Sequence, residues 1–67
     1  MAKKKYTIRK FDGDDEYSWA VFKMEDVKGM GNQIFYGEAK PIMSGLSRTS
    51  AQHERDILNK KYEGNKL

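Results

Sequence analysis

The sequence has no cysteine, one histidine and one proline among its 67 residues. Without cysteine there is no disulfide framework, and a single histidine cannot complete a structural zinc site. We therefore expect neither a bound metal nor another cofactor. The absence of cysteine also fits the reducing cytoplasm, where we expect the protein to be located.

Long apolar runs are missing as well. No stretch approaches the roughly 20 apolar residues of a membrane-spanning helix, and no signal-peptide core follows the basic start. We expect no membrane contact. Hydrophobic residues nevertheless make up 37% of the composition, which is enough for a folded chain. The length allows one small domain, residues 1–67.

The residues needed for catalysis are scarce. His53 is the one imidazole base, and helical spacing places it opposite the apolar stripe of the predicted helix, facing solvent. Asp12, Asp14 and Glu16 alternate like the opening of an EF-hand loop. However, Tyr17 occupies the position that requires glycine, and Lys23 the position of the bidentate acid. These patterns predict a polar turn, no catalytic residues and no enzymatic activity.

The net charge of +3 is unevenly distributed. Residues 1–10 contain five basic side chains and no acid, whereas residues 11–30 contain six acids and two lysines. A basic N-terminal arm, residues 1–5, can contact phosphates. The acidic segment restricts any such contact to one face of the molecule.

Three extended segments are predicted over residues 6–46. Residues 6–10 alternate apolar and polar side chains, and residues 17–24 carry apolar side chains on both faces, which is typical of a middle strand. The third segment runs over residues 33–44 with a bulge or bend at Gly37, and Pro41 places its end at a sheet edge. We expect Trp19 or Phe22 to anchor the contact between sheet and helix.

A helix is predicted over residues 47–63. Ser47 or Thr49 can cap its start, since both precede suitable residues at the right spacing. Ala51, Leu58 and Tyr62 form a narrow apolar stripe, and Ile57 lies to one side of it. Gly64 ends the helix and begins a short tail, residues 64–67.

These elements predict an α+β fold, in which a three-stranded antiparallel sheet (β-β-β) is followed by one C-terminal helix packed on one face. One helix covers one face of a sheet, so the other face is expected to be uncovered. This order of elements, with a tryptophan on the middle strand, resembles the three-stranded DNA-binding domains of plant transcription factors and the amino-terminal domains of some phage integrases. Those domains dock a sheet in the major groove. No motif specific to either family is present, and no family is recognised.

Aromatic side chains on the predicted strands are interleaved with basic ones, a pattern that can stack bases and bind phosphates. We therefore predict a small non-enzymatic module that binds DNA or RNA through the uncovered sheet face and the basic arm. The alternative is a protein-interaction or regulatory adaptor, either a homodimer or a partner of a larger protein. The candidate nucleic-acid contacts are Lys3, Lys4, Lys5, Arg9, Lys10, Lys23, Tyr36 and Lys40.

Overall fold

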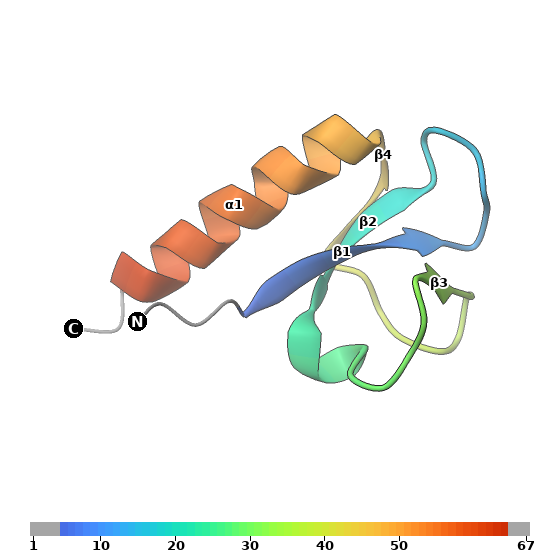
Figure 1. Ribbon diagram of the computed structural model, residues 1–67, viewed down its shortest axis with the longest axis horizontal. Helices are drawn as coiled ribbons and strands as arrows, with labels where there is room; N and C mark the ends of the chain where they lie inside the picture. The colour runs from blue at the N-terminus through green and yellow to red at the C-terminus, as the bar shows by residue number, and fades with distance from the viewer. Residues whose placement is uncertain (1–4, 65–67) are drawn as a thin grey trace.

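Six elements follow one another in the computed structural model, which describes residues 5–64 (Figure 1). They are β1 (Tyr6–Phe11), β2 (Trp19–Lys23), a short 3₁₀ helix η1 (Met24–Asp26), β3 (Gln33–Ile34), β4 (Met43–Leu46) and α1 (Arg48–Gly64). The predicted α+β fold with one C-terminal helix packed on a sheet is confirmed.

The sheet differs from the predicted one. It has four strands in the order β3-β1-β2-β4, and β1 pairs antiparallel with β2 but parallel with β3. β2 is a central strand, as predicted, because it lies between β1 and β4. The prediction of three antiparallel strands is therefore wrong, and the sheet is mixed.

The error arises in the third predicted segment, which is two strands on opposite edges of the sheet. Gly37 has φ 96° in a turn over residues 36–38, a conformation that residues other than glycine rarely adopt. Pro41 follows, and it cannot donate a hydrogen bond to a strand ladder. The chain therefore leaves β3 at one edge and begins β4 at the other.

The two faces of the sheet are covered by different parts of the chain. Arg48 at the start of α1 lies over the Trp19 ring, so Trp19 and Val21 face the helix, where Val21 and Ala51 are fully buried. Ala20 and Phe22 alternate with them and face the other way. α1 lies along one side of β1 and β2, whereas η1 and β3 lie on the other (Figure 1).

The face turned away from the helix is not free. Ala20 and Phe22 are fully buried there in a cluster with Val27 and Ile34, against which Phe11 and Ala39 pack. The expectation of an uncovered sheet face is therefore wrong, because residues 24–42 fold back over it. Phe22 belongs to this second core and not to the contact with the helix.

The start of α1 is set by Ser47. Its hydroxyl accepts a hydrogen bond from the Ser50 N–H at 3.2 Å, and its carbonyl accepts one from the Ala51 N–H at 2.8 Å. Ser47 is thus the cap, not Thr49. Ala51 is buried and Leu58 half-buried on the predicted stripe, while the side chain of Tyr62 lies outside the described residues.

A buried asparagine joins the helix to the first strand. Asn59 Oδ1 accepts hydrogen bonds from the Lys5 and Tyr6 N–H groups, both at 2.9 Å, and its Nδ2 donates to the Tyr6 carbonyl at 3.3 Å. The Tyr6 N–H and carbonyl point away from β2, toward the side where β3 pairs only with the far end of β1. Asn59 therefore takes the place of a neighbouring strand at the start of β1.

Candidate functional site

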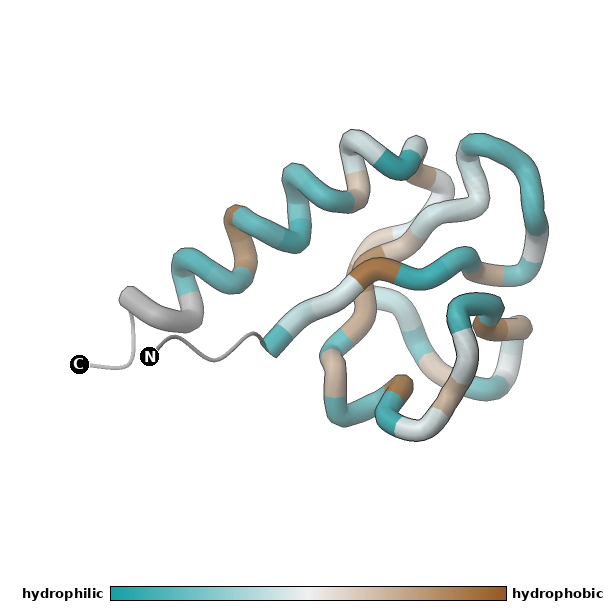
Figure 2. Tube along the Cα trace, viewed as in Figure 1, coloured by the Kyte–Doolittle hydropathy of each residue, from teal (hydrophilic) through white to brown (hydrophobic). Residues whose placement is uncertain are grey.

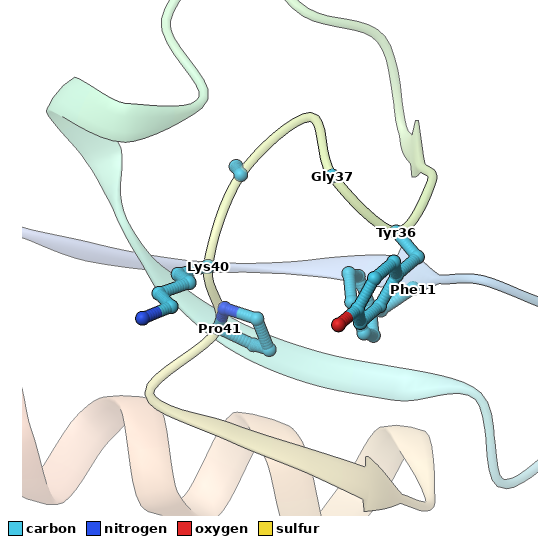
Figure 3. A pocket seen from close by; sticks show the side chains of 6 residues that line it. Phe11, Tyr36, Gly37, Lys40 and Pro41 are labelled. Atoms are coloured by element: carbon cyan, nitrogen blue, oxygen red, sulfur yellow. The ribbon is translucent and has the colours of Figure 1, made fainter.

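A cleft of about 290 Å³ opens on the face of the sheet turned away from α1. Phe11, at the end of β1, contributes one part of its wall, and the loop between β3 and β4 contributes the rest. In Figure 3 the aromatic rings stand on one side of the cleft and Pro41 and Lys40 on the other. The lining residues are Phe11, Tyr36, Gly37, Ala39, Lys40 and Pro41.

The aromatic wall is built outward from the core. The Phe22 ring is fully buried, and the Phe11 ring meets it edge-on with centroids 5.8 Å apart. Tyr36 then lies against Phe11 at 6.4 Å, tilted by 47°. Although its ring lies against Phe11 on one side, Tyr36 is 81% exposed to solvent. The exposed surface of Tyr36 is therefore available to contact another flat ring.

The loop that carries Tyr36 is held at several points. The Glu38 N–H donates to the Phe35 carbonyl at 3.0 Å, and the Phe35 N–H donates to the Glu38 carboxylate at 2.8 Å, closing a tight turn. Ala39 packs on the core, and the Ile42 N–H donates to the Val21 carbonyl at 2.7 Å. The cleft is therefore formed by anchored backbone.

The charge at the cleft comes from Lys40. This lysine is exposed, and it makes no ion pair with any residue that the structure describes. Its ammonium group points outward from the rim, away from the Tyr36 ring (Figure 3). None of the lining residues is acidic. Two exposed acids adjoin the lining residues in sequence: Glu38 lies between Gly37 and Ala39, and Asp12 follows Phe11 at the start of an acidic turn.

That acidic turn, residues 12–16, is a hydrophilic hairpin between β1 and β2 (Figure 2). Asp15 Oδ1 accepts hydrogen bonds from the Tyr17 N–H at 2.9 Å and the Ser18 hydroxyl at 2.8 Å. The Lys10 ammonium donates to Asp14 Oδ1 at 2.7 Å, and this hydrogen bond and charge hold the pKa of Asp14 below its ordinary 3.8. Among the described residues, no three His, Asp or Glu side chains gather as a metal site would require.

The predicted contact residues do not form one surface. Tyr36 and Lys40 come together in the cleft. Lys10 is paired with Trp19, and Lys23 lies two residues after Val21, so both side chains are on the helix side of the sheet. Lys10 Nζ lies 5.6 Å from the centroid of the Trp19 ring. Lys3 and Lys4 lie outside the described residues.

Two further predicted contacts are engaged within the chain. Lys5 forms an ion pair with Glu25 at 3.6 Å. Arg9 Nη1 donates to the Thr7 hydroxyl at 2.9 Å and to the Ile8 carbonyl at 2.8 Å. The Arg9 side chain thus folds along the edge of β1, where it satisfies a carbonyl that β3 does not reach.

Sequence reasoning missed Phe11 and Pro41 as parts of the cleft. Phe11 lies two residues after Arg9, so extending the alternation of the first strand by one residue would have placed it on the same face. It also missed Arg48, whose guanidinium carbon lies 5.7 Å from the Trp19 ring centroid. No pattern in the sequence brings Arg48 to Trp19, because that contact depends on how α1 crosses the sheet.

Comparison of the chain with models of protein families, with curated proteins and with solved structures finds no match. In the part of the chain that the structure describes, no helix combines the length and the apolar composition needed to cross a membrane. The candidate site therefore rests on the geometry of the cleft and on the residues that line it.

Proposed function

We propose that this protein is a small non-enzymatic module that binds nucleic acid, with the cleft between Tyr36 and Lys40 as its main contact. One observation carries the proposal: a largely exposed tyrosine and a lysine that forms no ion pair with the described residues, both predicted as contacts, line the same cleft. Aromatic rings stack on bases and lysines bind phosphates. The absence of cysteine favours a cytoplasmic location for this activity.

The distribution of charge supports one orientation of the ligand. Phosphates are attracted toward Lys40 and repelled by the acids next to the lining residues, Asp12 after Phe11 and Glu38 after Gly37. Lys3 and Lys4 are proposed as further phosphate contacts, whereas Lys5 is paired with Glu25 and Lys23 lies on the helix side of the sheet. Arg9 and Lys10 contribute less in this proposal, because hydrogen bonds within the chain occupy them.

A titration against salt tests the proposal. The intact chain is titrated into fluorescently labelled single-stranded and duplex probes at low salt, and the titration is repeated as salt is added. Each phosphate contact contributes about −0.7 to −0.9 to the log–log slope, so three to five contacts predict a slope of roughly −2 to −4. Failure to bind either probe at tens of micromolar protein would refute a nucleic-acid function.

Apolar side chains near the cleft favour a second candidate, a protein partner. Phe35 is 55% exposed and Ile42 is 42% exposed, on either side of the segment that lines the cleft. Exposed apolar surface of this kind occurs at protein interfaces. The partner would be a larger protein or a second copy of the chain. Sedimentation that gives a monomer at high micromolar concentration would exclude the homodimer.

A further inference from the structure

We infer that the cleft holds one unpaired base, stacked on Tyr36, with the adjoining phosphate beside Lys40, and that the module therefore prefers single strands to duplexes. This inference rests on the proposed function and names the form of nucleic acid that the site takes. It follows from three features: the size of the cleft, the fixed backbone that carries Tyr36, and the position of Lys40.

The size of the cleft suits a single ring system. Drug-sized ligands occupy clefts of about 300–1,000 Å³, and this cleft of about 290 Å³ is at the lower end. Its lining is mostly apolar, with Phe11, Ala39 and Pro41 beside the Tyr36 ring. One flat heterocycle fits such a space, whereas the sugar and phosphate to which it is attached remain outside.

The aromatic wall is prepared for stacking before a ligand arrives. Phe11 contacts Tyr36 from one side, and the turn closed by Glu38 and Phe35 fixes the backbone on which Tyr36 is carried. Little conformational freedom of the loop is then lost when a base stacks, which favours binding. By contrast, Tyr17 is 62% exposed but lines no part of the cleft.

The position of Lys40 matches the outer part of a nucleotide. In Figure 3 its ammonium group extends away from the Tyr36 ring. We place the phosphate of a seated base on that side. Two exposed acids adjoin lining residues in the sequence: Asp12 follows Phe11, and Glu38 lies between Gly37 and Ala39, where its carboxylate accepts a hydrogen bond from the Phe35 N–H. Lys40 is the basic residue that lines the cleft, so the phosphate is placed on the side of Lys40 and Pro41.

A duplex cannot use this cleft without distortion. Its bases are paired and stacked on both faces, so one would have to be extruded at a cost in free energy before it reached Tyr36. A single strand presents bases that are already unpaired. Duplex DNA would then bind only through phosphate contacts, with no contribution from the tyrosine.

The test compares matched variants on two kinds of probe, a labelled single strand (oligothymidylate or oligouridylate) and a duplex of equal length. Tyr36→Ala should weaken single-strand binding by about 5- to 150-fold, the loss expected for one stacked base. Tyr36→Phe keeps the ring and should bind as the parent does. Tyr17→Ala is the control, since it removes an exposed tyrosine that does not line the cleft. Binding to the duplex should change little in all three variants.

Lys40→Gln should reduce the salt slope by about one, as expected for one lost phosphate contact. Lys28→Gln, which removes another exposed lysine, is its control. Comparing the deoxyribose and ribose probes separates DNA from RNA as the preferred source of the base. Far-ultraviolet circular dichroism of each variant checks that the fold is retained.

Two results would overturn the inference and are distinguishable from each other. If the parent binds both probes equally and Tyr36→Ala behaves like Tyr17→Ala, the seated base is wrong while nucleic-acid binding stands. If the parent binds neither probe, the proposed function fails together with the inference.

Discussion

Replacing Asn59 with alanine tests how the helix is tied to the sheet. The amide of Asn59 joins α1 to both the N–H and the carbonyl of Tyr6, and it also accepts a hydrogen bond from the Lys5 N–H. Alanine removes all three hydrogen bonds and leaves those backbone groups at the edge of β1. Because Lys5 and Tyr6 are only half-buried, water can replace some of the hydrogen bonds that the substitution removes.

The expected magnitude follows from these contacts. Each hydrogen bond contributes about 0.5–1.5 kcal/mol, and alanine regains about 0.5 kcal/mol because it favours a helix more than asparagine does. We expect Asn59→Ala to lower the free energy of unfolding by roughly 1–4 kcal/mol. A domain of this length has about 3–10 kcal/mol in total, so the loss is readily measured.

Urea unfolding followed by Trp19 fluorescence provides the assay, and hydrogen exchange of the Tyr6 amide reports the site itself. Lys60→Ala is the control, since this exposed neighbour on α1 should change stability by less than about 0.5 kcal/mol. If Asn59→Ala is as stable as Lys60→Ala and the Tyr6 amide stays protected, the assigned role of Asn59 is wrong.

Two further predictions concern the second core and the acidic turn. Phe22→Ala should cost about 3–5 kcal/mol and largely unfold the chain, whereas the exposed Phe35→Ala should leave the thermal melt nearly unchanged; equal melts would refute the core assignment. The pKa of Asp14 should lie below 3.8 in an NMR titration and return toward that value in Lys10→Gln. Because the folded-state pKa is lowered, the pair stabilises the fold above pH 3.8 and its contribution is lost as the pH falls through the lowered pKa.

Local patterns in the sequence predicted the elements that depend on neighbouring residues. The spacing of Ala51 and Leu58 predicted the helix and its buried face, and the capping patterns limited the cap to Ser47 or Thr49, of which the structure uses Ser47. The apolar character of residues 17–24 on both faces predicted a central strand. Both cores of the fold meet there, at Val21 and at Phe22.

The strand pairing was not predictable from the same patterns. An extended segment of residues 33–44 has the same alternation whether it is one strand or two, and only the turn at Gly37 decides where it divides. Parallel pairing of β3 with β1 depends on the path of the chain after η1, which has no signature in the sequence. For the same reason, the sequence did not predict that residues 24–42 cover the face of the sheet turned away from α1.

The candidate site was predicted in part. Tyr36 and Lys40 were singled out because an aromatic and a basic residue lay close together in an extended segment. Phe11, which supports the tyrosine, comes from a distant strand, and the register of β3 against β1 brings the two together. The hydrogen bonds of Arg9 with Thr7 and Ile8 were equally beyond prediction, since alternation gives the face of a side chain but not its partners.

An NMR titration of the isotope-labelled chain with a short single-stranded oligonucleotide tests the central claim most directly. The account predicts that the backbone amides of Tyr36, Gly37, Ala39 and Lys40 shift most, and that the amide of the exposed His53 on α1 stays unchanged. The largest shifts on the opposite side of the sheet, at Trp19 and Arg48, would contradict it, as would a spectrum that does not change.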